Sequence, residues 1–347
     1  MSFAHLHVHS QFSLLNGTAS PEALARRAAE LGMPALALTD SANLFGGVAF
    51  YKACKSAGIR SVLGTEITVQ PEGLEFKDPE RENGGYQLRL LVENDRGYSN
   101  ICALITRAIY DGIHFRPRID LDLLEQHREG LIVLSGGGKG VLGRMLLQGK
   151  VDRARQRLVD LRERLGDDQL YLELIDLGIE GHDLLNDAAR QLSADLSIET
   201  VATNAVHYLK PDDAGVLETL HAIGLGCSLD DPSRLMVQTD QAWLKSEEEM
   251  RAIFAEDPDA LSRTVQLAER CDYHYDFKTY HFPATTPPDF VIDDKGQTLR
   301  GQPDTDDNWA YFYKAFPPPR DYGLPDPEDA IPDRPDGAGN LCGYFEW

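Results

Sequence analysis

The chain has 347 residues, with 56 acidic against 34 basic side chains and a formal net charge of −22 at pH 7. Extended binding to a nucleic-acid backbone draws on clustered Lys and Arg, so this balance argues against strong autonomous DNA or RNA binding. A small local site could still accept a phosphate, particularly if a metal supplied the positive charge. Hydrophobic residues make up 42% of the chain, as in a globular protein, and no apolar run approaches the roughly 18 residues of a membrane span.

Cysteine usage and the N-terminal residues indicate the compartment. The five cysteines are odd in number, scattered, and without a Cys-x-x-Cys spacing, which argues against a disulfide framework or a thiolate zinc site. The first residues lack a basic segment followed by an apolar one, so no export signal is visible. These features predict a cytoplasmic protein with free thiols.

The first third of the chain alternates short apolar runs with amphipathic stretches. Ser20 has the side chain of an N-cap and Pro21 the fixed φ of a first helical residue, so a helix is expected from there to Gly32. The strands expected in this part are residues 4–9, 34–40, 59–69 and 86–93, and the helices are 20–32, 45–58 and 97–112.

The same alternation continues to about residue 210. Strands are expected at 130–137, 169–175 and 198–204, with helices at 139–148 and 183–196 between them. Repeated strand–helix units with mostly apolar strands are typical of a parallel α/β sheet covered by helices. This many units favours a closed barrel over an open sheet, and barrels of this kind carry their chemistry at the C-terminal ends of the strands.

Two segments follow the predicted barrel of residues 1–210. Residues 211–282 have the pattern of a helical extension, including a Glu-rich stretch that is typical of a charged first helical turn. Residues 283–347 hold eleven of the 19 prolines, with 13 acids against 5 bases, which predicts an irregular acidic tail. The tail also carries aromatic residues, so we expect part of it to dock on a surface or on a partner.

Side chains that bind metals gather where the predicted strands end. In the stretch AHLHVH, alternation along a strand places His5, His7 and His9 on one face. Imidazole nitrogens plus a carboxylate are the usual ligands of zinc, manganese or iron. His7, His9, Glu66 and His207 are therefore candidate ligands of one site at the top of the barrel, whereas His5 is expected to be a hydrogen-bonded histidine at its edge.

Other polar patterns have simpler interpretations. In the stretch LSGGGKGVLG, Gly140 follows Lys139 where a phosphate-binding loop would have Ser or Thr, so a tight strand-to-helix turn is expected. Its backbone amides could still accept an anion. Ser10 and Ser13 lie near His9 but lack an orienting base for a nucleophilic triad, and we expect them to be turn hydroxyls.

Longer stretches of the chain resemble a known family. The resemblance is to the N-terminal PHP (polymerase and histidinol phosphatase) domain of the bacterial replicative DNA polymerase III alpha subunit. It is carried by FAHLHVHSQFSLLNG, ALALTDSANLFGGVAFYKACKSAGI, VLGTEI, LLVENDRGYSNI, RPRIDLDLLEQHREGLIVLSGG, YLELID and VATNAVHYL. The stretch LDDPSRLMVQTDQAWLKSEEEMRAIFAEDPDALSRTVQLAERC resembles the segment that follows this domain and leads toward the polymerase palm, so the whole resemblance runs from about residue 2 to residue 288. It implies a distorted (β/α)7, TIM-like barrel, in agreement with the strand–helix pattern.

The resemblance also implies a metal centre for phosphoester hydrolysis, of which this chain keeps only part. His7 and His9 match the family's His-x-His, Glu66 matches the glutamate that bridges metals, and His207 matches the last histidine of an Asp-x-His pair. At six other ligand-type positions the family residue is replaced: aspartates by Asn16 and Ala205, histidines by Ser41, Gln87 and Leu177, and a cysteine by Gly137.

These replacements imply a degenerate metal site. Several metal ions need several anionic ligands to offset their mutual repulsion, and Glu66 is the only clear carboxylate left. Leu177 and Ala205 have no atoms that coordinate a metal. The expected cofactor is therefore none, or one divalent ion, zinc or manganese, on His7, His9 and Glu66.

Three hypotheses for the function follow from the resemblance. The family's nucleotide transfer takes place in a palm domain that lies outside these residues, so the chain is expected to be the PHP portion of an alpha subunit or a free-standing derivative. The first hypothesis is a largely non-catalytic scaffold in DNA replication, docked to the polymerase core or to a proofreading exonuclease. The alternative is a metal-dependent phosphoesterase or 3′–5′ exonuclease that uses the residual site. The third makes residues 289–347 a partner-binding segment.

Overall fold

The computed structural model describes residues 2–77, 85–146, 149–231 and 239–279, together with the backbone of two short strands further on. The chain divides into a compact unit of residues 1–276 and a second unit of residues 277–347. The tail predicted for residues 283–347 lies outside the described residues, apart from the paired strands β8 (Val291–Ile292) and β9 (Thr298–Leu299).

A seven-stranded sheet forms the centre of the first unit. Its strands follow the order β1-β2-β3-β5-β6-β7, and β4 pairs with the end of β2. The bounds of these strands are β1 (Ala35–Leu38), β2 (Arg60–Gln70), β3 (Tyr86–Val92), β4 (Arg118–Asp120), β5 (Leu131–Leu134), β6 (Leu170–Ile175) and β7 (Thr200–Thr203).

The N-terminal segment closes this sheet into a barrel. His5 pairs in parallel with Leu36 of β1, and Val8 pairs in parallel with Val206, just after β7. The amide of Val206 donates to the carbonyl of His7 at 3.1 Å. The segment therefore lies between the first and the last strand of the sheet, and the predicted α/β fold with a distorted, TIM-like barrel is confirmed.

One strand runs against the expected parallel direction. β3 is antiparallel to both β2 and β5, whereas β1 pairs with β2, β5 with β6, and β6 with β7 in parallel. The described residues between β2 and β3 form no helix, so the chain returns along β2 instead of crossing over. As a result, the first residues of β3, including Gln87 and Arg89, lie at the edge where β2 ends.

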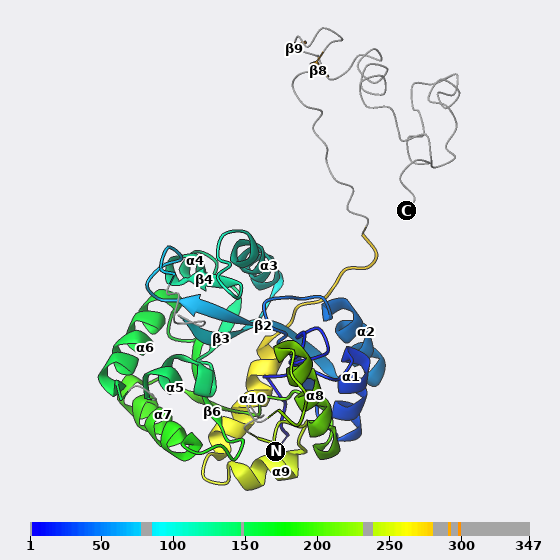
Figure 1. Cartoon of the computed structure of the whole chain (residues 1–347), viewed down its shortest axis with the longest axis vertical. Coiled ribbons are helices and arrows are strands. Elements are labelled where there is room, and N and C mark those ends of the chain that lie inside the picture. The colour runs from blue at the N-terminus through cyan, green and yellow to red at the C-terminus, as the bar shows by residue number, and fades with distance from the viewer. Residues whose placement is uncertain are drawn as a thin grey trace, which may run out of the picture. The chain divides into compact units, whose positions relative to one another are not determined.

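Helices surround the sheet, as Figure 1 shows. The first begins as predicted, because the side chain of Ser20 accepts the amide hydrogen of Ala23 and Pro21 is the first helical residue. The helices before β7 are α1 (Pro21–Glu30), α2 (Gly47–Ala57), α3 (Asp95–Tyr110), α4 (Leu121–Gln126), α5 (Val141–Leu146), α6 (Val151–Leu165) and α7 (His182–Leu196).

The sequence patterns do not predict β4, α4 or α6. The longest of these, α6, is dominated by charged residues, and its apolar positions form only a narrow stripe at helical spacing. The buried residues of this stripe are Ala154, Leu158, Leu161 and Leu165.

Among the described residues after β7, a short 3-10 turn (Pro211–Asp213) is followed by the helices α8 (Ala214–Leu225), α9 (Glu247–Ile253) and α10 (Pro258–Arg270). α10 packs against β7 and β1, and its Thr264 accepts the amide hydrogen of Ala4 at 3.1 Å. α9 begins at the Glu-rich stretch, where Ser246 and Glu249 cap each other's backbone amides. This helical segment is therefore packed on the barrel within the same compact unit.

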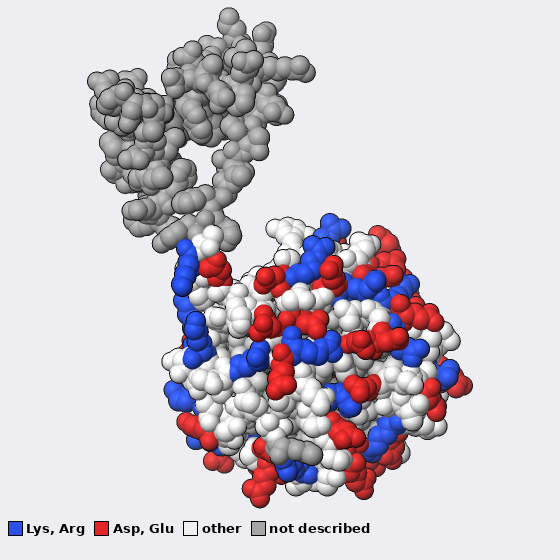
Figure 2. Space-filling view, turned by 180° about the vertical axis from the view of Figure 1, so that it is seen from behind, with Lys and Arg blue, Asp and Glu red and all other residues white. Residues whose placement is uncertain are grey.

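The surface of the described residues is mixed in charge. Figure 2 shows acidic and basic side chains interspersed over one face of the first unit, without a continuous basic area there. None of the described helices is long and apolar enough to cross a membrane. In the interior, the buried charged residues stand out against an apolar core, and Arg89 forms ion pairs with two of them, Glu66 and Glu173.

Candidate metal centre

The predicted ligands His7 and His9 lie on the N-terminal segment that closes the barrel. Both side chains are 1% exposed, and the residues that alternate with them belong to the hydrophobic core. Strand alternation therefore turns both imidazoles to the same side. His5 follows the same alternation but contacts a different group, since its Nε2 hydrogen-bonds the carbonyl of Lys245 at 2.9 Å.

His7, His9 and Glu66 form a tight group. His7 Nε2 lies 3.2 Å from His9 Nε2, and Glu66 Oε2 lies 3.8 Å and 3.7 Å from these two nitrogens. One ligand atom from each residue lies within 4.8 Å of the others, so the three side chains could hold a metal ion. Two imidazoles and a carboxylate are a donor set that zinc, manganese and iron accept.

Hydrogen bonds on the far side of each ring assign the imidazole protons. His7 Nδ1 lies 2.9 Å from Glu173 Oε1, and because an ionised carboxylate only accepts, this nitrogen carries the hydrogen. His9 Nδ1 lies 2.9 Å from the hydroxyl of Ser13, which itself donates to Asp40 at 2.6 Å, so this nitrogen donates as well. Both Nε2 atoms therefore carry lone pairs, and they face one another across 3.2 Å.

Neither imidazole carries a charge of its own at neutral pH. Burial lowers the pKa of His7 and of His9 below the usual value. Two lone pairs that converge in a buried site need a donor or a cation between them. The same arrangement is found in metal-binding histidines, whose second ring nitrogen donates to a carboxylate or another acceptor.

Arg89 supplies a donor to one of the two lone pairs, that of His7. Its Nη2 lies 3.0 Å from His7 Nε2 and 2.8 Å from Glu66 Oε2, and its Nε lies 3.2 Å from the same imidazole nitrogen. Its Nη1 lies 3.5 Å from Glu173 Oε2. One guanidinium therefore connects two buried carboxylates and a histidine. The β2–β3 ladder pairs Arg89 directly with Glu66, which places both side chains on the same face of the sheet.

The guanidinium keeps both carboxylates ionised. Burial alone would raise the pKa of Glu66 and of Glu173, but the positive charge of Arg89 and the effects of neighbouring groups, His7 among them, together outweigh it. The pKa of Glu66 falls below its usual range, and that of Glu173 is lowered to about 2. Thr203 also donates its hydroxyl to Glu173, so this carboxylate is hydrogen-bonded as well as paired.

His207, the fourth predicted ligand, stacks on this group. Its ring lies parallel to that of His9, with centroids 4.6 Å apart and an angle of 1° between the planes. Its Nδ1 hydrogen-bonds the carbonyl of Asn16, and burial lowers its pKa to about 3. The side chain of Asn16 in turn lies 3.2 Å from His221 Nε2. His207 thus orients the second histidine of the group by contact.

The six positions at which the resemblance predicts a lost ligand fall into two sets. Asn16, Ser41 and Gln87 line a cavity of about 440 Å³ together with Glu66. The hydroxyl of Ser41 donates to Glu66 Oε1 at 3.3 Å, so Ser41 hydrogen-bonds the carboxylate of the group. The other three replacements are buried, and they are Gly137, Leu177 and Ala205.

The glycine-rich stretch forms the expected tight turn. Gly137–Lys139 is a single 3-10 turn between β5 and α5. Gly136 before it has φ +95°, and a Cβ there would lie 1.8 Å from the carbonyl oxygen of Gln87, so only glycine fits. Lys139 and Arg116 line the cavity that contains Glu66, which makes this cavity locally basic within an acidic protein.

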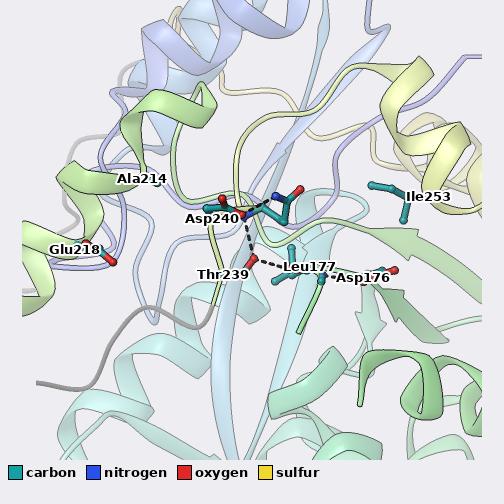
Figure 3. Close-up of a pocket in the computed structure, with 9 residues that line it drawn as sticks. Asp176, Leu177, Ala214, Glu218, Thr239, Asp240 and Ile253 are labelled. Atoms are coloured by element: carbon teal, nitrogen blue, oxygen red, sulfur yellow. Dashed lines mark hydrogen bonds between the residues drawn. The ribbon is translucent and has the colours of Figure 1, made fainter. Parts of the chain in front are cut away.

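A second cavity, of about 570 Å³, is acidic. Its lining includes Asp176, Glu218 and Asp240 and, among the described residues, no histidine or cysteine. Figure 3 shows that the hydroxyl of Thr239 in this cavity hydrogen-bonds the backbone of Leu177. The larger cavity is therefore separate from the histidine group.

Sequence reasoning misses the two residues that complete the group. Arg89 lies inside the apolar run YQLRLLV, and Glu173 lies inside LYLELI. Both strands are buried along their whole length, and a charged residue in such a strand needs a buried partner. This pattern could have identified them. Ser10 and Ser13, expected to be turn hydroxyls, both donate to the buried Asp40.

Comparison with known proteins places the chain in context. Residues 5–176 match the PHP domain family. The chain is 39% identical over 274 residues to the DNA polymerase III subunit alpha of Treponema pallidum, which covers 78% of this chain and 23% of that protein. It is 37% identical over 299 residues to that of Borreliella burgdorferi, over 86% and 26%. A solved two-domain protein of Bacteroides vulgatus, containing a predicted PHP-like metal-dependent phosphoesterase, gives a TM-score of 0.39 at 14% identity, over 72% of this chain and 62% of that chain.

The barrel, its His-x-His segment and the family match define the class: residues 5–176 are a PHP domain. The resemblance predicted from the sequence is thereby confirmed. More particularly, the chain is homologous to the N-terminal part of the DNA polymerase III alpha subunit, and it spans about a quarter of the length of these relatives, 23% and 26% in the two cases above.

The buried ion pairs predict a large effect on stability. We expect Arg89→Leu to lower the free energy of unfolding by about 3–5 kcal/mol, because it leaves Glu66 and Glu173 buried without their cation. Urea unfolding measures the loss. Arg60→Leu is the matched control, since Arg60 pairs with Asp272 at the surface and should contribute at most about 1 kcal/mol. Equal losses in the two variants would contradict the central role of Arg89.

The buried histidines predict a loss of stability in acid. Burial lowers the pKa of His5 to about 4, whereas the unfolded chain keeps a value of about 6.5. Between these two values the unfolded state binds more protons than the folded state, so the free energy of unfolding falls as the pH falls. The shifts of His7 and His9 act in the same direction.

We therefore expect His5→Gln to make this pH dependence shallower by about one proton, or about 1.4 kcal/mol per pH unit, between about pH 6.5 and 4. Urea unfolding at a series of pH values measures the slope. His274→Gln serves as the control, because the side chain of His274 is 65% exposed. A stability that stays constant or rises on acidification would contradict the assignment of neutral, buried imidazoles.

Proposed function

We propose that this chain acts in DNA replication as a largely non-catalytic PHP scaffold of a DNA polymerase III alpha subunit. The observation that carries the proposal is the Arg89 guanidinium, which hydrogen-bonds both His7 and Glu66. A catalytic metal site keeps an open position for water or substrate. Here Arg89 engages His7 Nε2 and Glu66 Oε2, and by the sequence resemblance Leu177 and Ala205 replace further ligands.

The relatives support the polymerase context. They are alpha subunits of DNA polymerase III, and the chain matches about a quarter of their length. We propose the polymerase core and a proofreading exonuclease as partners. A net charge of −22 and the mixed surface in Figure 2 favour protein partners over autonomous binding to nucleic acid.

Exposed apolar side chains near the histidine group provide a surface for such a partner. Leu14 is 77% exposed and Leu15 45%, and on α8 Ile223 is 64% and Leu225 55% exposed. The loop and the helix are adjacent, because a Cβ built on Gly224 would lie 2.9 Å from a methyl group of Leu15. Clustered exposed apolar residues are a common feature of protein interaction sites.

The docking proposal predicts that the chain forms a complex with the proofreading exonuclease subunit of the same replication system. In the double variant Leu14→Ser/Ile223→Ser we expect binding to weaken by about tenfold or more, because anchoring apolar contacts dominate such interfaces. Isothermal titration calorimetry measures the affinity. Ile113→Ser/Leu184→Ser is the matched control, with the same two kinds of substitution at side chains that are 55% and 68% exposed outside this surface. Absence of any complex with the native chain would contradict the docking role.

A second candidate function is metal-dependent phosphoester hydrolysis, or 3′–5′ exonuclease activity, on the residual site. The geometry of His7, His9 and Glu66, which could hold one ion, is the observation that favours it. His7 and His9 would bind the ion through Nε2, and Glu66 would bind it through a carboxylate oxygen. The ion would supply Lewis acidity and lower the pKa of a bound water.

A metal count separates the two candidates. Under the scaffold proposal we expect fewer than about 0.1 zinc or manganese ions per purified chain, because Arg89 already engages His7 Nε2 and Glu66 Oε2. We also expect no turnover of a generic phosphate ester after addition of Mn²⁺ or Zn²⁺. Elemental analysis and a colorimetric phosphatase assay measure these quantities. One tightly bound ion per chain, with turnover that His9→Ala abolishes, would establish the hydrolase instead.

A further inference from the structure

We propose that Arg89 is the resident cation of this centre: its guanidinium takes the place of a divalent metal and excludes it. The proposal concerns what the site binds and is independent of whether the domain docks a partner. It goes beyond the loss of ligands, because it assigns the positive charge of the site to a residue of this chain.

Arg89 contacts the same atoms of His7 and Glu66 that a metal ion would bind. A metal held by this group would need His7 Nε2 and an oxygen of Glu66. Arg89 Nη2 lies 3.0 Å from that nitrogen and 2.8 Å from Glu66 Oε2, and Nε also lies 3.2 Å from the nitrogen. An ion bound to these lone pairs would have to displace N–H groups that already occupy them, so guanidinium and metal compete for the same atoms.

The hydrogen bonds around His7 and His9 still orient both rings for a cation. Glu173 accepts from His7 Nδ1, and Ser13, itself bonded to Asp40, accepts from His9 Nδ1. These bonds orient both rings with the Nε2 lone pairs inward, as metal-binding histidines are oriented. The outer contacts of a metal site are therefore present, and an N–H donor fills its centre.

The positive charge of Arg89 balances buried carboxylates and opposes a second cation. Arg89 Nη1 faces Glu173 Oε2 at 3.5 Å while Nη2 bonds Glu66, so one positive charge serves two buried carboxylates. A divalent ion bound to the same atoms would bring two further positive charges into contact with the guanidinium, with almost no water to screen them. Arg89 is 4% exposed, and its Nη1 and Glu173 Oε2 have no other hydrogen-bond partner among the described groups.

The register of β3 with its two neighbouring strands holds Arg89 in place. Arg89 is paired with Glu66 on one side and with Leu134 of β5 on the other. Because β3 lies between two neighbours, its backbone cannot shift without breaking both ladders. The guanidinium is therefore a fixed part of the site, not a surface side chain that folds in.

The experiment titrates the purified chain and its variants with Zn²⁺, and separately with Mn²⁺, by isothermal titration calorimetry. We expect no saturable binding to the native chain at the histidine group. Arg89→Leu should bind one ion per chain, at least about tenfold more tightly than the weakest binding that the titration detects. The size follows because groups that contact metal ligands change the affinity by about 10- to 100-fold. Arg60→Leu, which removes the same charge at the surface, should behave as the native chain does.

Further variants keep the test decisive. Arg89→Leu/His9→Ala should lose the gained binding, because it lacks one of the ligands. Where Arg89→Leu does not fold, Arg89→Leu/Glu173→Gln restores the net charge of the cluster and keeps His7, His9 and Glu66, and it should show the same gain. Arg89→Lys, which keeps the charge, should remain unable to bind metal. Equal metal binding by the native chain and a folded Arg89→Leu variant, or no gain in either folded variant, would overturn the proposal.

Discussion

The contact between the Arg89 guanidinium and two buried carboxylates is the interaction on which the centre of this barrel depends. Glu66, Glu173 and Arg89 come from three different strands, and none of them is stable as a buried charge without the others. Their pairing requires the antiparallel course of β3, because only this direction brings the first half of β3 beside the end of β2. The strand that departs from the parallel pattern thus supplies the cation.

The closure of the barrel supplies the other half of the site. The N-terminal segment bridges β1 and the chain after β7, and its alternation turns His7 and His9 inward toward the guanidinium. Both rings are held as neutral imidazoles by acceptors on their far sides. The retained His-x-His of the PHP family therefore has a structural role here whether or not an ion ever binds: it accepts hydrogen bonds from Arg89 and, through His9, packs against His207.

Under the proposal that Arg89 replaces a metal, the barrel needs no ion to hold its centre together. Apolar residues at positions such as Leu177 and Ala205 need no metal charge, and the remaining carboxylates are neutralised by an arginine. Such a domain keeps its surfaces for partners while its centre becomes part of the core. The proposed scaffold role in a DNA polymerase III alpha subunit is consistent with both features.

The sequence by itself determined the barrel and the candidate ligands. Apolar strand–helix alternation predicts the α/β class, and the His-x-His spacing places two imidazoles on one face, because both patterns follow from local periodicity. Only the tertiary structure decided what these imidazoles contact. Arg89 and Glu173 are far from His7 in sequence, and the direction of β3 depends on a connection whose length does not reveal its course. Pairing between distant strands set the charge of the site, and local sequence carries no record of that pairing beyond an arginine and a glutamate in apolar strands.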